Sequence, residues 1–290
     1  MRCVYITMDD MGDYVSDADL SLEPMQALGW QVDKISWRAD VDWGDYDLAY
    51  VCTPWDYHKH LDDFLAVIDT IDRSDVVLAN PGAIIRWNAD KRYLKVLDQK
   101  GAAIVPSLWF DTFAPDCLST AFAQFATNKI VIKPVVGASA LDTYVLAGMP
   151  DNGLLDELAR AYRDRPFFLQ PFLQTVADTG EYSLMYVDGE FSHAILKVPK
   201  PGDFRTQEEH GSDIQPYLAS PEMVAQGQAL VDSLDPPVAY ARVDYVHGDD
   251  GGLWLMELEL IEPSLYFRTN EGSAVRFARA MTRYYERQES

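Results

Sequence analysis

The chain has 290 residues, 48% of them hydrophobic, which is enough to bury a full core in two or three lobes. Its 46 acidic side chains outnumber the 24 basic ones and give a net charge of −22, which argues against binding to nucleic acid or to anionic membranes. The three cysteines are too few and too widely spaced for a disulfide framework or a zinc site, and the polar start and short apolar runs predict a cytoplasmic protein without signal peptide or membrane span.

The first eighty residues alternate strands with helices. We predict strands at Cys3–Thr7, Gln31–Trp37 and Leu48–Cys52, and helices at Asp19–Leu28 and Leu61–Ile71. This alternation is typical of a parallel, doubly wound sheet. The turn sequence Asn80-Pro81-Gly82 marks the end of this α/β unit.

The rest of the chain has an antiparallel α+β pattern. A short helix is predicted at Asp90–Gln99, with Asn88 as its N-cap. We predict extended segments at Ile104–Pro106, Ser107–Phe110, Ile130–Pro134, Tyr144–Leu146 and Phe167–Gln170, and hairpins Glu181–Val187/Glu190–Lys197 and Ala239–His247/Leu253–Ile261. Further helices are predicted at Ser119–Ala126, Leu154–Tyr162, Glu222–Leu234 and Ser273–Glu286.

The last hairpin carries three carboxylates. Glu257 and Glu259 alternate with apolar residues, so both point to one face of the strand while Met256 points to the other. Asp244 lies on the paired strand and can join them. An all-oxygen set without His or Cys suits Mg²⁺ or Mn²⁺. The alternative is an exposed strand face with solvated acids.

Two lysines are candidates for binding phosphate. Lys133 ends an apolar strand just before the small-residue loop Val135–Thr143, which contains Gly137, Ala138 and Ser139. Small residues let backbone N–H groups approach an anion, and the ammonium group supplies charge. Lys91 opens the predicted helix that follows Asn88. An ordinary hairpin loop is the alternative.

Other segments have weaker signals for nucleotide and substrate. The proline-stopped strand end Gln170, Pro171, Phe172 and Leu173 could present backbone groups to an adenine edge, with Asp178 or Glu181 near a ribose; a plain strand end is the alternative. Lys197, Lys200, Arg205 and His210 concentrate positive charge in and beside the polar loop Pro199–Asp213, which together with Val135–Thr143 is a candidate lid. An exposed, salt-bridged loop is the alternative.

The remaining candidates concern the substrate and the packing around it. Trp55, Asp56 and Tyr57 follow a strand's C-terminal end, where α/β domains bind ligands, or they form an aromatic contact between lobes. Arg242 is expected on the strand face opposite to Asp244. We interpret His193 as a packed structural residue.

The order of these motifs resembles the ATP-grasp superfamily. The resemblance runs over about residues 80 to 270 and rests on NADK, IVIKP with its small-residue loop, LQPFL, GEYSL, GDFR, and RVDYV paired with LMELELIEPS. The segments WDYH, RWNADKRYL and LELIEPSLYF are most similar to the branch that contains the D-cycloserine synthetases (O-ureido-D-serine cyclo-ligases).

The resemblance implies a fold and a set of roles. It implies an N-terminal Rossmann-like domain at 1–80 and two α+β lobes, 81–170 and 171–290, that enclose ATP. Lys91, Lys133 and the Gly137–Ser139 loop would contact its phosphates, Gln170–Leu173 its adenine and Asp178 its ribose. Asp244, Glu257 and Glu259 would hold two Mg²⁺ ions (or Mn²⁺). Arg205 and Lys197 would act on the transferred phosphoryl group, and Ser264 would contact substrate. Many members have Asn where this sequence has Glu259.

The function implied is an ADP-forming ligase. It would activate a small-molecule carboxylate as an acyl phosphate and join it to a nitrogen nucleophile, in the same or another molecule. The substrate would be amino-acid-derived, and the superfamily suggests a homodimer. The alternatives are an ATP-dependent small-molecule kinase and a non-catalytic ATP-binding regulatory module.

Overall fold

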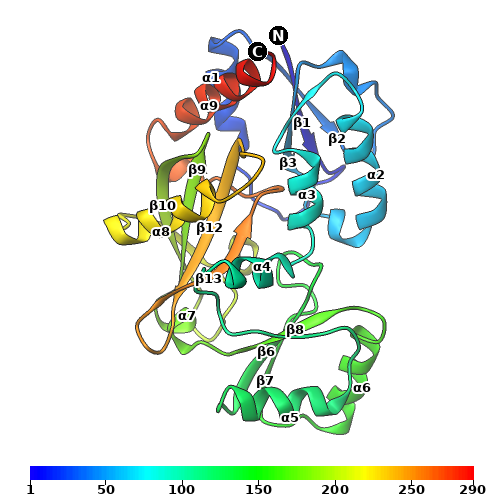
Figure 1. Cartoon of the computed structure of the whole chain (residues 1–290), viewed down its shortest axis with the longest axis vertical. Coiled ribbons are helices and arrows are strands. Elements are labelled where there is room, and N and C mark those ends of the chain that lie inside the picture. Colours follow the sequence, from blue (N-terminus) through cyan, green and yellow to red (C-terminus); the bar gives the residue numbers. More distant parts are fainter.

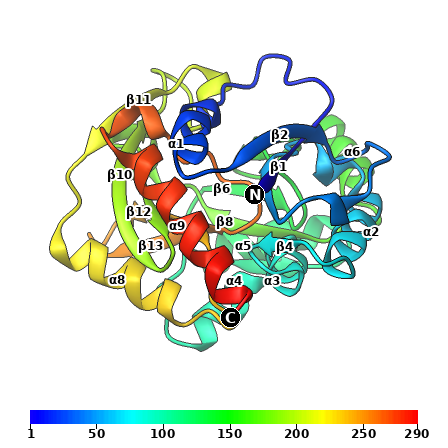
Figure 2. The same ribbon diagram turned by 90° about the horizontal axis from the view of Figure 1, so that it is seen from above.

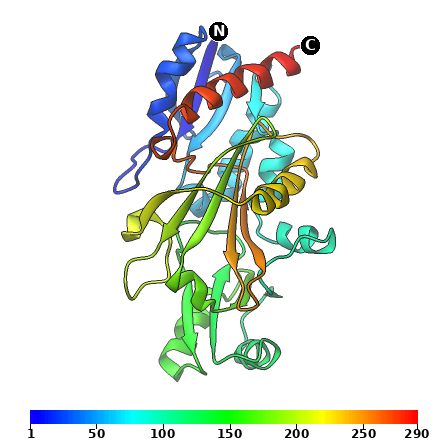
Figure 3. The ribbon, with the colours of Figure 1, turned by 90° about the vertical axis from the view of Figure 1, so that its left-hand side faces the viewer.

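The computed structural model describes the whole chain, residues 1–290, and its strands form three sheets. The sheets follow one another along the long axis of the molecule, with the N-terminal sheet at one end (Figures 1 and 3). No helix is both long and apolar enough to cross a membrane.

The N-terminal sheet is parallel, as the alternation of strands and helices predicted. Its order is β2-β1-β3-β4, formed by β1 (Arg2–Thr7), β2 (Gln31–Ser36), β3 (Leu48–Thr53) and β4 (Val77–Ala79). Helices α1 (Leu22–Ala27) and α2 (Leu61–Asp72) lie between its strands in the sequence, together with short 3-10 turns at Ala18–Ser21, Trp43–Asp45 and Tyr57–Lys59. Strand β4 was not predicted, because three residues are too few to establish a periodic pattern.

Two short helices connect this sheet to the rest of the chain. They are α3 (Gly82–Asn88) and α4 (Tyr93–Gln99), where the sequence predicted one helix with Asn88 as its N-cap. That prediction was wrong, because Asn88 ends α3. Its side chain donates to Leu258 O (2.8 Å) and accepts from Leu260 N (2.9 Å), so it ties the connection to a distant strand.

A second four-stranded sheet, hereafter the four-stranded sheet, is antiparallel and has its own core. Its order is β5-β8-β6-β7, formed by β5 (Leu108–Phe110), β6 (Lys129–Pro134), β7 (Tyr144–Ala147) and β8 (Phe167–Pro171). Helices α5 (Pro115–Gln124) and α6 (Asn152–Ala161) supply Leu118 and Leu158 to a core with Ile130 and Phe167. A separate core allows this unit to act as one lobe.

The five-stranded sheet contains both predicted hairpins. Its order is β11-β10-β9-β12-β13, formed by β9 (Glu181–Val187), β10 (Glu190–Val198), β11 (Asp213–Tyr217), β12 (Tyr240–His247) and β13 (Leu253–Glu259). The helices are α7 (Gln174–Asp178), α8 (Pro221–Asp232) and α9 (Ser273–Gln288), with 3-10 turns at Glu208–His210 and Phe267–Thr269. Strand β11 and helix α7 were not predicted.

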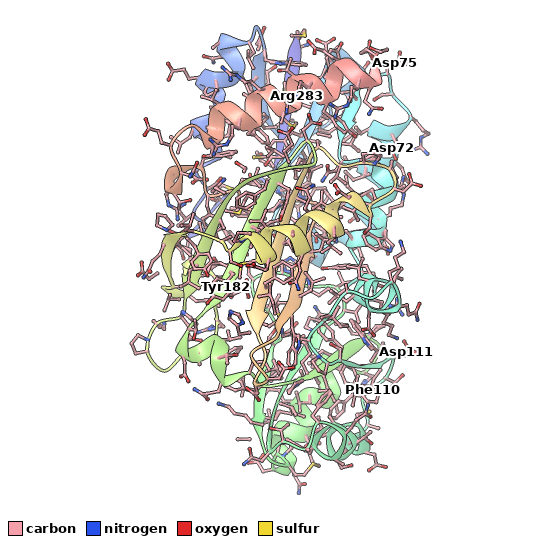
Figure 4. All side chains as sticks on the ribbon, turned by 60° about the vertical axis from the view of Figure 1, so that its left-hand side comes forward. Asp72, Asp75, Phe110, Asp111, Tyr182 and Arg283 are labelled. Carbon is pink, nitrogen blue, oxygen red and sulfur yellow. The ribbon has the colours of Figure 1, made fainter.

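Helix α9 joins the five-stranded sheet to the N-terminal sheet. Phe277 and Tyr284 of α9 share one core with Tyr50 of β3 and Tyr240 of β12. Figure 2 shows α9 beside α1 near the N-terminus. Figure 4 labels Arg283 on α9 at one end and Phe110 and Asp111 toward the other, with Tyr182 of β9 between them. The N-terminal sheet and the five-stranded sheet therefore form one packed body.

Candidate active site

A cavity of about 230 Å³ lies where the three sheets meet. Its walls come from the strand ends of β6 and β8, the loop between β6 and β7, strands β10, β12 and β13, and the segment after β3. Of the sequence-predicted site residues, the cavity is lined by Lys91, Lys133, Gly137, Ala138, Ser139, Gln170, Pro171, Phe172, Leu173, Lys197, Arg205, Asp244, Glu257, Glu259, Trp55, Tyr57 and Ser264. Residues far apart in the sequence thus share one enclosed space.

The three carboxylates of the last hairpin line the same cavity, although they are not gathered as a metal cluster. Asp244 on β12 is directly opposite Glu257 on β13, and Arg242 is opposite Glu259. Asp244 is buried, with 2% of its side chain exposed, whereas Glu257 and Glu259 are 29% and 27% exposed. The two glutamates therefore remain accessible from the cavity, while Asp244 lies at its floor.

A β-bulge on the last hairpin alters the predicted alternation. The register shifts between Asp244 and Tyr245, so the chain gains one residue at Met256. Met256 was predicted to point away from the carboxylates, and this was wrong: it lines the cavity, with its Sδ 3.4 Å from Lys133 Nζ. The bulge brings an apolar side chain next to a lysine.

Arg242 supplies positive charge among these carboxylates. The prediction that it points away from Asp244 was wrong, because residues two apart on a strand share a face. Its guanidinium donates to Asp244 (Nε to Oδ1, 3.0 Å) and also pairs with Glu259. Burial raises the pKa of Asp244, but Arg242 and Lys197 outweigh it and hold that pKa below its ordinary value. Burial raises the pKa of Glu259 to about 7 despite Arg242.

Lys197 forms a second buried ion pair with Asp244. Its side chain is 5% exposed and contacts Glu181, with Asp244 Oδ2 3.6 Å away. Burial would lower its pKa, but Asp244 and Glu181 raise it, so the ammonium stays charged. The backbone carbonyl of Lys197 packs closely against Gly180. A Cβ on residue 180 would lie 2.4 Å from Lys197 O, and the φ angle of +112° also favours glycine there.

Lys91 and Lys133 differ in what neutralises them. Lys91 pairs with Glu257. Lys133 has no carboxylate in ion-pair contact; its near neighbours are Met256 and the ring of Phe168, 6.0 Å away. Burial lowers the pKa of Lys133. A partly buried cation without a counter-ion in a cavity wall is suited to bind an anion.

The small-residue loop after β6 has an unusual backbone. Ser139, Ala140 and Asp142 have positive φ angles of 51°, 54° and 53°. Arg165 donates to Val136 O (3.0 Å) and pairs with Asp142, which holds this conformation in place. Backbone strain at non-glycine residues is frequent in ligand clamps, so the loop fits the phosphate-binding role expected of it.

The polar loop before β11 reaches the same small-residue loop. His210 Nε2 lies 3.3 Å from Ser139 O, so the two predicted lid segments touch each other. Arg205 lines the cavity and makes a bidentate pair with Asp203, its Nη2 2.7 Å from Oδ2. Lys200 lies 3.8 Å from the same carboxylate. The cations of this loop are thus largely paired locally.

Two predicted site residues lie outside the cavity lining. Asp178 is exposed at the end of the unpredicted helix α7 and accepts from Gln174 Nε2 (2.8 Å). Glu181, the other ribose candidate, does line the cavity. Asp56 accepts from Trp37 Nε1 (2.9 Å) and pairs with Arg38, away from its neighbours Trp55 and Tyr57.

Glu262 is a cavity residue that the sequence analysis did not select. It follows β13, and its backbone carbonyl accepts from Trp55 Nε1 (2.9 Å). Burial, strengthened by Glu259, raises the pKa of its carboxyl to about 8, while the charge of Lys91 and the hydroxyl of Tyr57 act in the opposite direction. The sequence signal was present, since Glu262 continues the acidic spacing of LELIEPS, but it lies beyond the regular strand.

The carboxylate set is chemically suited to a divalent cation. Asp244, Glu257 and Glu259 offer only oxygen atoms, which Mg²⁺ prefers, and the two glutamates are accessible from the cavity. In this structure their charge is balanced by Lys91 and Arg242, and no three His, Cys, Asp or Glu side chains are gathered as a metal cluster. The oxygen donors of these three residues therefore fit Mg²⁺.

Comparison with known proteins defines the class. Residues 3–80 match the family model for the N-terminal domain of D-cycloserine synthetase DcsG. The chain is 30% identical over 279 residues to the cycloserine biosynthesis protein DcsG of Streptomyces lavendulae, covering 90% of this chain and 91% of that protein. The crystal structure of D-cycloserine synthetase DcsG superposes with a TM-score of 0.85 at 27% identity, covering 98% of this chain and all of that one.

The fold is also that of more distant ligases. D-alanine–D-alanine ligase of Bacillus anthracis superposes with a TM-score of 0.70 at 15% identity, over 99% of each chain. The fold and the relatives define an ATP-grasp enzyme, an ATP-dependent carboxylate–amine ligase. Within that class the chain belongs to the D-cycloserine synthetase family. The predicted superfamily, branch and fold are confirmed.

Proposed function

We propose that this ligase activates the carboxylate of a small, amino-acid-derived substrate as an acyl phosphate and joins it to a nitrogen nucleophile. The nucleophile belongs either to the same molecule, in which case a ring closes, or to a second molecule. The supporting observation is a single cavity that combines Lys133, a cation without a carboxylate partner, with the oxygen donors Glu257 and Glu259. The similarity to a cycloserine biosynthesis protein supports an amino-acid-derived substrate and intramolecular ring closure.

The nucleotide is assigned to the side of the cavity formed by β6 and β8. Lys133 and the Gly137–Ser139 loop contact the phosphates, and the backbone at Gln170–Leu173 contacts the adenine. Gln170 is held by a bond from its Nε2 to Ser107 Oγ (3.0 Å), which fixes the end of β8. Lys91 also contacts the phosphates, and for this it gives up part of its ion pair with Glu257.

Magnesium is assigned to Asp244, Glu257 and Glu259. Two bound Mg²⁺ ions would neutralise charge on the triphosphate during transfer. The chain's own residues have complementary roles: Lys197 and Arg242 keep Asp244 ionised, and Arg205 faces the transferred phosphoryl group.

The reaction proceeds by two displacements. An oxygen of the substrate carboxylate attacks the γ-phosphorus and ADP leaves; the nitrogen nucleophile then attacks the acyl carbon and inorganic phosphate leaves. The two loops that meet at Ser139 and His210 would exclude water, which would otherwise hydrolyse the acyl phosphate. A substrate kinase would stop after the first displacement.

The domain boundaries 1–80, 81–170 and 171–290 remain our proposal. They are supported by the distribution of strands, since each sheet lies almost wholly within one of these ranges; only the last residue of β8, Pro171, passes a boundary. The four-stranded sheet with its own core would then be the lobe that moves over ATP.

ADP release tests the function directly. O-ureido-D-serine is the first substrate to be tried with Mg·ATP, with hydroxylamine added to trap an acyl phosphate as a hydroxamate. We expect ADP formation that depends on the substrate, and a hydroxamate at the expense of the ring product. Substrate-dependent ADP with a stable phosphoester and no hydroxamate would identify a kinase. No ADP with any amino acid, while ATP binds, would identify a regulatory module.

A further inference from the structure

Glu262 is a cavity carboxylate beside the proposed metal ligands that has no lysine or arginine within ion-pair distance. In the same cavity Glu257 pairs with Lys91, Glu259 with Arg242, and Glu181 with Lys197. Glu262 forms no ion pair, although it is partly buried among other acids. An ionised carboxylate in such surroundings is costly unless a cation accompanies it.

The surroundings of Glu262 are aromatic and are supplied by the N-terminal unit. Trp55 is fixed to the same residue through its indole N–H, 2.9 Å from Glu262 O, and its ring lies 5.3 Å from that of Tyr14. Tyr57 is close enough for its hydroxyl to affect the pKa of the Glu262 carboxyl group. These three aromatic residues all line the cavity. A carboxylate beside aromatic faces is the environment that an organic ammonium group prefers, since both the charge and the ring faces attract it.

The position of Glu262 separates it from the proposed nucleotide contacts. It belongs to the segment that leaves β13, and its partners follow β3 at the C-terminal end of a parallel strand, where α/β units receive ligands. The phosphate-binding loop and Lys133 belong instead to the four-stranded sheet. A group bound between Glu262 and Trp55 is therefore part of the substrate and not of ATP.

We propose that Glu262, with Tyr57 and Trp55, binds a primary ammonium group that the substrate carries in addition to its reacting carboxylate. This inference rests on the proposed ligase function and assigns the residues that would hold the amino group of its substrate. The bound ammonium would lower the pKa of Glu262 and keep it ionised. Glu262 is thus a specificity-determining residue, and Tyr57 orients its carboxylate.

The experiment compares two ligands that differ only in the amino group, O-ureido-D-serine and its desamino analogue 3-(ureidooxy)propanoate. Binding to the ADP-loaded protein is measured by titration calorimetry, and turnover by ADP release. The variants are Glu262→Gln, which keeps the size of the side chain, Tyr57→Phe, and Glu190→Gln as a control at the exposed start of β10. Thermal unfolding checks that each variant is folded.

We expect the wild type to prefer the amino compound by about tenfold to a hundredfold, the contribution of a hydrogen bond to a charged group. Glu262→Gln should lose this preference through weaker binding of the amino compound, with unchanged KM values for ATP and Mg²⁺. Tyr57→Phe should lose part of it, and Glu190→Gln none. The wild-type comparison still tests the proposal if Glu262→Gln does not fold.

Three results would overturn the proposal: a wild type that binds both ligands equally, a Glu262→Gln variant that weakens both equally, or one whose defect is removed by excess Mg²⁺. The last would mean that Glu262 serves the metal. Calorimetry keeps the two hypotheses apart. Preferential binding without ADP formation would refute the proposed function alone, whereas ADP formation without preference would refute the ammonium site alone.

Discussion

Replacement of Lys133 by Met is the sharpest test of the nucleotide site. Lys133 lies in the cavity wall without a carboxylate partner, and burial already lowers its pKa. Methionine has a similar length and is apolar. Because Lys133 pairs with no carboxylate, its replacement leaves no buried acid without a counter-ion. The folded state should therefore be as stable as the wild type, or slightly more so, since the desolvation cost of the ammonium group is removed.

The loss should appear in the affinity for ATP. A hydrogen bond to a charged group contributes about 1.5–3 kcal/mol, so the dissociation constant for ATP should rise about 10- to 140-fold. Titration calorimetry with Mg·ATP and thermal unfolding of the ligand-free protein give the two numbers. Lys95→Met is the control, because Lys95 is on α4, lies over the ring of Trp109, 5.2 Å from its centroid, and neither residue lines the cavity.

Unchanged ATP affinity in Lys133→Met would refute the assignment of the phosphate site. A loss of affinity equal to that of Lys95→Met would also contradict it, because the effect would then come from the net charge of the protein. A large fall in unfolding temperature would mean that Lys133 has a structural partner that its contacts do not show.

Four further predictions test the other parts of the site. Glu257→Gln should abolish turnover and leave the fold intact, as measured by ADP release and circular dichroism; near-normal activity would remove the metal assignment. Arg205→Ala should lower kcat more than it weakens ATP binding, and a change in ATP affinity alone would place Arg205 on the nucleotide instead. Lys197→Met should destabilise the protein by about 3–5 kcal/mol in urea unfolding, because buried Glu181 loses its ion-pair partner and Asp244 keeps only Arg242; a neutral result would mean that Glu181 is protonated. Burial lowers the pKa of His193 to about 4, so between about pH 6.5 and 4 the unfolded chain binds a proton that the folded chain does not, and stability should fall by about 3 kcal/mol as pH drops through this window. His193→Gln should reduce that fall, and an unchanged pH profile would exclude His193 as its source.

Local sequence patterns located most of the site. Asp244 and Glu257 were predicted to face each other because the hairpin is closed by a short glycine-rich turn, and the structure pairs them directly. Lys133 was selected because it ends an apolar strand before small residues. Such signals depend on alternation and turns, which the sequence displays within a few residues.

The predictions failed where contacts come from distant segments or where a strand is irregular. Met256 faces Lys133 because of a bulge, and Asn88 is a bridge to β13 instead of a helix cap. Asp178 is turned outward by a helix of only five residues. The first two features depend on one residue of register or on a partner more than a hundred positions away, and neither leaves a periodic trace in the sequence. The helix before Asp178 is too short to show a period.

By itself, the sequence determined most of the strands and helices, the class of enzyme and the residues that carry charge, because these follow from local periodicity and from motifs in a fixed order. Only the tertiary structure decided how those charges are matched: it paired Lys91 with Glu257 and Arg242 with Glu259, and left Lys133 and Glu262 without partners. The physical reason is that an ion pair depends on distance in space, and the chain brings these groups together from loops and sheets that are far apart in sequence.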